Sequence, residues 1–235
     1  RSADWIKTQF LMQRQSSQGA PAFLGVPDTS KFVKQIDPQQ TYAAYTYRRT
    51  LTINKDKVEG FSNHRDFPIL VNVTLDPSKV ESENGYDIVF TDASDELLQH
   101  EIESYDPATG ELIAWVKIPI LSRTSDTVVN VRYGNASVNT DPSTSAVWSG
   151  GFTSVFHFGE ESWASGVAGE VVDSVGRNPG TAENGSTPTS AGRIGPAAFF
   201  DGTDDYIELA NEADFDYVGS SITVSAWVHA DTFAE

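Results

Sequence analysis

The sequence predicts an all-β protein, and three observations lead to this expectation. Six short segments between residues 42 and 135 are rich in β-branched and aromatic residues. Turn residues separate these segments at the spacing of an antiparallel β-sandwich. No helical period competes with them over that range. The segments expected to form strands are 42–54, 66–76, 86–92, 97–106, 112–121 and 126–135.

The second half of the chain is also expected to be all-β, but with longer loops. FTSVFHFG (152–159) and SSITVSAWVHA (220–230) each predict a strand, and AAFFDGTDDYIELA (197–210) predicts two strands about a tight turn. The stretch 162–196 is rich in Gly, Ser and Asn. Three or four strands are too few to close a core of ordinary size, so we expect residues 141–235 to be unstable in isolation.

The charge distribution divides the chain into two regions of different chemistry. The 235 residues carry a formal charge of −17, of which residues 1–140 contribute −4 and residues 141–235 contribute −13. Such an acidic chain is repelled by nucleic acid and by anionic lipid, so neither is an expected partner. No apolar run approaches the length of a membrane span, and the opening residues lack the apolar core of a signal peptide.

Residues 43–135 resemble a bacterial and archaeal family known as domain of unknown function 2341. The resemblance rests on YRRTLTI, DFPILVNV, GYDIVFTDASDELLQHEIESYD, ELIAWVKIP and VVNVRYGN. The activity of that family is not established, so the resemblance implies an architecture more than a function. Members of the family commonly precede a LamG-like domain.

The second half resembles the start of such a LamG-like, concanavalin A-like jelly roll. Four stretches occur in the order expected for that family: SVFHFGE, VVDSVGRNPGTAENG, GRIGPAAFFDGTDDYIEL and ITVSAWVH. They lie between residues 154 and 229, and their combination in this order is more specific than any one of them. The resemblance therefore implies an antiparallel sandwich followed by a partial jelly roll.

The opening RSADWIKTQF reads as a short amphipathic helix. It resembles the tail that often ends a LamG-like unit. The expected organisation is then a fragment of a tandem array, with neighbouring LamG-like domains as partners in the same chain. The expected segments are a helical tail at 1–16, a linker at 17–41, the sandwich at 42–135, a linker at 136–151 and a truncated jelly roll at 152–235.

A calcium site is expected at the turn FDGTDDYIEL. Asp201, Asp204 and Asp205 place carboxylates close together, and Ca²⁺ takes oxygen ligands. Asp173, in the Gly-rich loop, adds a further oxygen if that loop folds back. The resemblance supports this expectation, because LamG-like domains often hold Ca²⁺ at a loop rim. The alternative is that Asp201-Gly202 serves only the turn and that the other acids are solvated.

Three other residues are candidates for ligand contact. Trp148 and Trp163 lie in polar loops, where an aromatic side chain suits a binding site. His157 lies between two phenylalanines and is expected to face away from both. The alternative for His157 is a structural histidine, hydrogen-bonded at a sheet surface. Trp115 and Trp227 lie in apolar segments and are expected in the core.

The segment HEIESYD raises the question of catalysis. Glu101 and Glu103 are two residues apart on a predicted strand, so both project from one face. That separation is near the one used by glycosidases. The alternative is an exposed sheet face with Tyr105 as its apolar or edge contact.

The function expected from these features is non-enzymatic binding of carbohydrate or another cell-surface ligand. The parent protein is expected at the cell surface, outside the cell or in the periplasm, with Ca²⁺ as a possible cofactor. Two alternatives stay open, namely a carbohydrate-active enzyme and a structural repeat of a surface protein.

Overall fold

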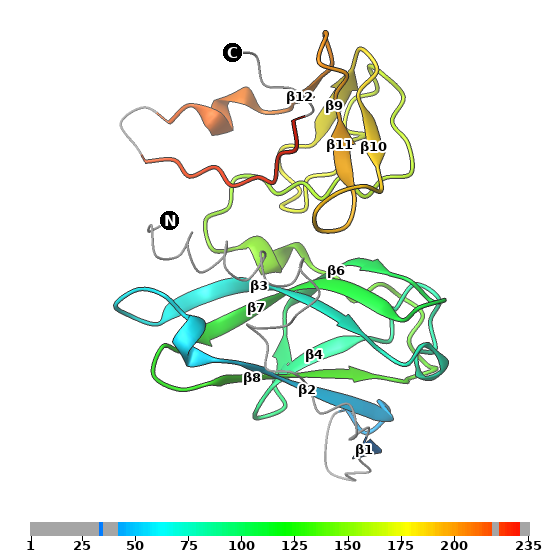
Figure 1. The fold of residues 1–235 in the computed structure, drawn as a ribbon, viewed down its shortest axis with the longest axis vertical. Helices are drawn as coiled ribbons and strands as arrows, with labels where there is room; N and C mark the ends of the chain where they lie inside the picture. The colour runs from blue at the N-terminus through cyan, green and yellow to red at the C-terminus, as the bar shows by residue number, and fades with distance from the viewer. Residues whose placement is uncertain (1–32, 35–41, 218–220, 231–235) are drawn as a thin grey trace.

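A computed structural model describes residues 33–34, 42–217 and 221–230, and in these residues the protein is all-β (Figure 1). The prediction of antiparallel β-structure is confirmed. The predicted N-terminal helix (1–16) and nearly all of the predicted linker (17–41) lie outside the described residues. No helix in the described part of the chain is long and apolar enough to cross a membrane.

Two antiparallel sheets form the sandwich. The first has the order β1-β2-β8-β4-β5, with β1 (Val33–Lys34), β2 (Tyr47–Ile53), β8 (Thr127–Tyr133), β4 (Val89–Asp92) and β5 (Leu97–Leu98). The second has the order β3-β7-β6, with β3 (His64–Thr74), β7 (Glu111–Leu121) and β6 (His100–Tyr105). Three short 3₁₀ helices accompany them, η1 (Lys55–Lys57), η2 (Pro77–Lys79) and η3 (Ser145–Trp148). All six strands predicted between residues 42 and 135 are present.

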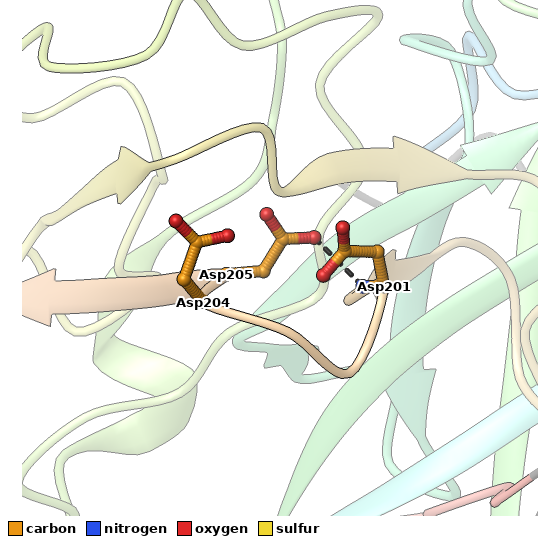
Figure 2. Close-up of side chains that lie close together, drawn as sticks. All are labelled: Asp201, Asp204 and Asp205. Carbon is orange, nitrogen blue, oxygen red and sulfur yellow. Dashed lines mark hydrogen bonds between the residues drawn. The ribbon is translucent and has the colours of Figure 1, made fainter.

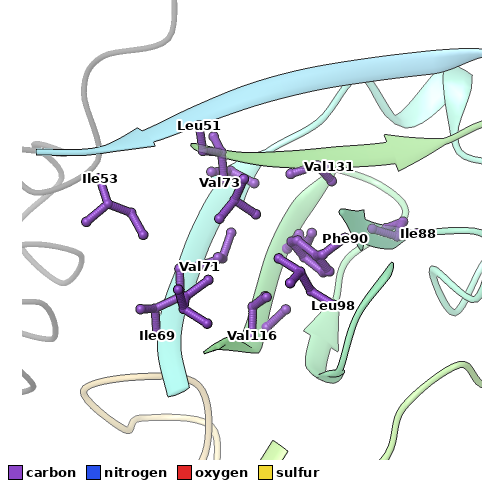
Figure 3. Packing of buried hydrophobic residues seen from close by; sticks show 14 of the residues in the cluster. Leu51, Ile53, Ile69, Val71, Val73, Ile88, Phe90, Leu98, Val116 and Val131 are labelled. Carbon is purple, nitrogen blue, oxygen red and sulfur yellow. The ribbon is translucent and has the colours of Figure 1, made fainter. Parts of the chain in front are cut away.

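The main core lies between these two sheets (Figure 3). Strand alternation explains it, because successive side chains of a strand point to opposite faces. In β3 the inward residues Phe67, Ile69 and Val71 are buried in this core, whereas Leu70 points to the opposite face. The second sheet therefore also carries apolar side chains on its other face, which is turned away from this core. This face is called the outer face below.

A buried carboxylate connects the loop before β4 to the end of β8, and these two strands are neighbours in the first sheet. Asp87 is fully buried, just before β4. Its oxygens accept hydrogen bonds from the backbone N–H groups of Glu81, Ser82, Gly134 and Asn135, at 3.0, 3.0, 2.8 and 3.2 Å. Buried polar groups are costly unless they are paired, and here one carboxylate satisfies four donors. Asp87 therefore connects the loop before β4 to the end of β8.

Residues 152–217, called the C-terminal region below, lie over the outer face (Figure 1). They contain β9 (Gly180–Glu183), β10 (Thr187–Thr189), β11 (Ala197–Phe199), β12 (Tyr206–Leu209) and the 3₁₀ helix η4 (Glu212–Phe215). The two strands predicted in 197–210 are present. They do not pair with each other, because β11 pairs with β10 and β12 pairs with β9. The buried core of this region is small, with Trp163, Val171 and Ala182 at its centre.

Two segments predicted as strands form no ladder. Residues 152–159 run without strand pairing, and so do residues 221–230. The expectation that Trp227 lies in the core is wrong, since its side chain is 40% exposed and lies 5.8 Å from the Arg193 guanidinium. A strand needs a neighbour to satisfy its backbone groups, and no neighbouring strand pairs with residues 221–230 in the described part of the chain.

Candidate functional site

The outer face carries a cluster of charged and aromatic side chains where the C-terminal region meets it. This junction cluster consists of Glu101, Glu103, Trp115, Trp148, His157 and Ser174. The two glutamates lie on β6, where the pairing with β7 shifts by one residue between Ile102 and Ser104. Such a bulge adds one residue to a strand and turns the following side chains over.

The bulge decides which side chains of β6 face outward. Glu101 and Glu103 both point away from the main core, as their spacing predicts, whereas Tyr105 packs against that core. The alternative of an exposed face with Tyr105 on it is therefore wrong. The C-terminal region covers the outer face, and the Glu103 side chain is only 2% exposed.

His157 lies between the two carboxylates. Its Nε2 atom is 3.4 Å from Glu101 Oε2, and its Nδ1 atom is 3.2 Å from Glu103 Oε2. The neighbouring Phe156 and Phe158 pack on the small core of the C-terminal region. The predicted alternation of these three side chains is therefore confirmed, although the segment forms no strand ladder.

Two tryptophans enclose the imidazole and donate to the same carboxylates. Trp115 Nε1 donates to Glu103 Oε2 at 2.6 Å, and Trp148 Nε1 donates to Glu101 Oε2 at 2.5 Å. The His157 ring stacks on Trp115, with centroids 6.0 Å apart, and lies 5.7 Å from the Trp148 ring. Ser174 Oγ donates to Glu101 Oε1 at 2.6 Å, so another loop of the C-terminal region also reaches β6.

The two carboxylates keep the imidazole protonated. Burial by itself would lower the pKa of His157, but hydrogen bonds to Glu101 and Glu103, together with their charges, raise that pKa to about 9. Burial also tends to raise the pKa of Glu101, yet the donors His157, Ser174 and Trp148 bring it below its usual value. At neutral pH the imidazolium of His157 therefore lies beside a charged Glu101 carboxylate.

The arrangement has a clear chemical consequence for the glutamate pair. A glycosidase needs two carboxyl groups that can both reach a sugar placed between them. Here the His157 ring fills the space between Glu101 and Glu103, and both carboxylates already accept hydrogen bonds from tryptophan. The geometry suits the attachment of two regions to each other better than it suits acid–base chemistry.

A second cluster lies on the turn between β11 and β12. Asp201, Asp204 and Asp205 each offer a carboxylate oxygen, and these oxygens lie within 4.8 Å of one another. Figure 2 shows the three carboxylates on the same side of the turn. Asp205 Oδ2 accepts from the backbone N–H of Asp201 at 2.7 Å, and Asp201 Oδ1 accepts from that of Thr203 at 2.8 Å. Three converging carboxylate oxygens fit the chemistry of Ca²⁺, which takes six to eight oxygen ligands.

Asp173 is not part of this group. It is buried, and its carboxylate accepts from the backbone N–H groups of Val155, Val175, Arg177 and Asn178, at 2.9, 3.1, 3.0 and 2.8 Å. Like Asp87, it serves as an anchor for loop backbone. The structure thus brings together three of the four acids named from the sequence as calcium ligands.

The aromatic candidates are more enclosed than their polar sequence neighbours indicate. Trp148 belongs to the junction cluster and is buried there. Trp163 is also buried, donates from Nε1 to Glu160 Oε2 at 3.2 Å and makes an edge contact with Phe158. Neither ring presents a free face to an outside ligand in this conformation.

Three exposed aromatic side chains beside the aspartates were not singled out from the sequence. Phe199 and Phe200 directly precede the turn, and Tyr206 directly follows it. All three are about half exposed. The signal was present in the letters FFD and DDY, where aromatic residues adjoin the aspartates on both sides.

These observations define an antiparallel β-sandwich domain whose outer sheet face is covered by a smaller β-region. Residues 84–165 match a family model described as domain of unknown function (DUF2341). This is the family whose resemblance the sequence indicated. The match includes both glutamates and the histidine of the junction cluster and ends before the three aspartates. No curated protein and no solved structure matches the chain significantly.

Proposed function

We propose that the chain is a non-enzymatic binding module of a larger cell-surface or secreted protein, and that it binds carbohydrate at the turn between β11 and β12. The observation that carries the proposal is the group Asp201, Asp204 and Asp205 at a surface turn, with half-exposed aromatic residues directly before and after it in the sequence. Carbohydrate sites combine oxygen ligands or hydrogen-bonding groups with aromatic faces that cover the apolar side of a sugar ring.

Calcium has a specific place in this proposal. Asp201, Asp204 and Asp205 would supply three carboxylate oxygens, and a bound Ca²⁺ would leave coordination positions for the hydroxyl groups of a sugar. The strongly negative charge of residues 141–235 favours a divalent cation there. Extracellular calcium modules bind with dissociation constants of about 10⁻⁴–10⁻³ M, so the expected affinity is weak.

We expect calorimetry of the full chain to detect Ca²⁺ binding, and a glycan array to show signals that a chelator removes. The variant Asp201→Asn/Asp205→Asn should lose the Ca²⁺ binding and the glycan signals, because two of the three charged ligands become neutral. The matched control Glu208→Gln/Glu212→Gln removes two exposed carboxylates from the same region and should keep both.

Two results would contradict the proposal. No heat with Ca²⁺ at millimolar concentration would remove the metal from it. Failure to bind any glycan in calcium would remove the carbohydrate, and would favour a structural repeat.

A further inference from the structure

The C-terminal region lacks a core large enough to be stable by itself. Its buried centre consists of Trp163, Val171 and Ala182, and its sheets have two strands each. A two-stranded sheet is marginal in water unless it packs on something else. The region must therefore gain much of its stability from the sandwich beneath it.

The contact between the two regions has an apolar part. On the sandwich side, Leu70, Ile113 and Trp115 form an apolar patch on the outer face, extended by η3. Partly buried side chains of the C-terminal region pack on this patch, namely Phe152, Val155, Val175 and Ile194. Four partly buried side chains form a modest hydrophobic contact, so the polar part of the junction matters for how firmly the region is held.

The polar part comes from three separate segments of the C-terminal region. His157 bonds to both glutamates of β6, and Ser174 bonds to Glu101. Gly195 approaches Glu103 so closely that a Cβ atom on it would lie 2.5 Å from Glu103 Oε1. The two carboxylates are thus the point on the sandwich to which three loops converge.

We propose that the junction cluster is a charge-dependent attachment, which holds the C-terminal region on the outer face at neutral pH and releases it when His157 or Glu101 becomes neutral. The sandwich remains folded in the released state because its main core lies between its own two sheets. The released state exposes the Trp115 and Trp148 rings, which are buried in the attached state.

The charges around His157 set the pH range of release. The titratable groups facing it are Glu101 and Glu103 on β6. Strand β7 and helix η3 present Trp115 and Trp148, which are uncharged. Lys117 follows Trp115 on the same face of β7, but its ammonium group points away from His157. Its Nζ donates to Ala146 O at 2.9 Å and to Ser149 Oγ at 3.1 Å.

The direction of the pH dependence follows from the sign of each shift. The pKa of His157 is raised from 6.5 to about 9. Its contribution to the free energy of attachment is therefore complete below pH 6.5 and is lost as the pH rises through about 9. The pKa of Glu101 is lowered from 4.5, so its contribution to the free energy of attachment is present above pH 4.5 and is lost on acidification below pH 4.5. Attachment is therefore favoured near neutral pH and weakens on both sides.

Hydrogen exchange of the full chain, measured by mass spectrometry at neutral pH, tests the attachment. In Glu101→Gln/Glu103→Gln we expect exchange of residues 152–183 to become at least about tenfold faster, while β2, β4 and β8 keep the wild-type rate. The matched control Glu83→Gln/Glu111→Gln removes two exposed carboxylates of the sandwich and should leave both regions unchanged.

Gly195→Ala tests the same junction from its other side. Gly176→Ala is its matched control, because both glycines have positive φ but a Cβ on Gly176 meets nothing within 4 Å. Faster exchange of residues 152–183 should appear in Gly195→Ala alone. Unchanged exchange of residues 152–183 in the glutamate variant, or an equal increase in both regions, would overturn the proposal.

An NMR titration of the histidine rings, with His157 assigned by its absence in His157→Gln, provides the second measurement. We expect His157 to lose its proton near pH 9, with protection of residues 152–183 falling over the same range. Titration of His157 near pH 6.5 would overturn the proposal. None of these results depends on Ca²⁺ or a glycan, so they are independent of the proposed binding function.

Discussion

Replacing His157 by glutamine is expected to lower the free energy of releasing the C-terminal region from the sandwich by about 3–5 kcal/mol at neutral pH, as for the removal of one partner from a buried ion pair. The imidazolium is only 15% exposed and contacts Glu101 and Glu103 together. Without it, two enclosed carboxylates face each other with no positive charge between them. Tryptophan fluorescence during a urea titration follows this release, since Trp115 and Trp148 line the site.

A thermodynamic cycle separates the charge of His157 from its packing. In the background Glu101→Gln/Glu103→Gln, the same substitution should cost much less, because the carboxylates that needed a counter-charge are gone. The difference between wild type and His157→Gln should also shrink as the pH rises through about 9. An equal cost in both backgrounds, at all pH values, would show that packing alone explains the effect.

Replacing Asp87 by alanine is expected to destabilise the sandwich by about 3 kcal/mol or more, since each buried donor left without a partner costs about 1–3 kcal/mol. The carboxylate accepts four backbone N–H groups, two from the loop before β4 and two from the end of β8. Its loss frees two loops at once. Chemical denaturation of the full chain measures the change.

Asp76→Ala serves as the comparison for Asp87→Ala. Asp76 caps η2 from a less buried position and accepts from Ser78 only, so its loss should destabilise the sandwich much less than the loss of Asp87. If Asp87→Ala cost no more than Asp76→Ala, the buried carboxylate would not be the connection between the loops that the geometry indicates.

The strands of the sandwich could be predicted from the sequence because each carries its own signal. In β3 and β7, alternation places Phe67 and Val116 in the main core, whereas Leu70 and Trp115 point to the outer face. This pattern depends only on neighbouring residues and on the two-residue period of a strand. The bulge at Glu103 left no such signal, and it turned Tyr105 inward against the simple alternation.

Strand pairing in the second half was less predictable because it depends on partners far along the chain. The stretch around Trp227 has the composition of a strand, yet in the described residues it forms no ladder. β11 and β12 were expected to pair about their shared turn, but each found a partner in the Gly-rich stretch, where the composition gave little indication of strands. Composition indicates that a segment can form a strand, whereas pairing depends on which other segment is available.

The two candidate sites also differ in how far apart their residues lie in the sequence. Asp201, Asp204 and Asp205 are neighbours in sequence, so a turn suffices to bring them together. The junction cluster joins Glu101 to His157 and Ser174, and only the packing of the C-terminal region on the outer face does this. Asp173 shows the limit of reasoning from residue type, since its carboxylate is bound to four backbone N–H groups of nearby loops.

The proposed binding surface is tested most directly by NMR spectra of the ¹⁵N-labelled full chain during addition of CaCl₂. We predict saturable shifts of the backbone amides of residues 200–206, with the amides of Glu101, Glu103 and His157 unchanged. Absence of shifts at residues 200–206, or shifts centred on the two glutamates of β6, would contradict a calcium-dependent surface at the turn between β11 and β12.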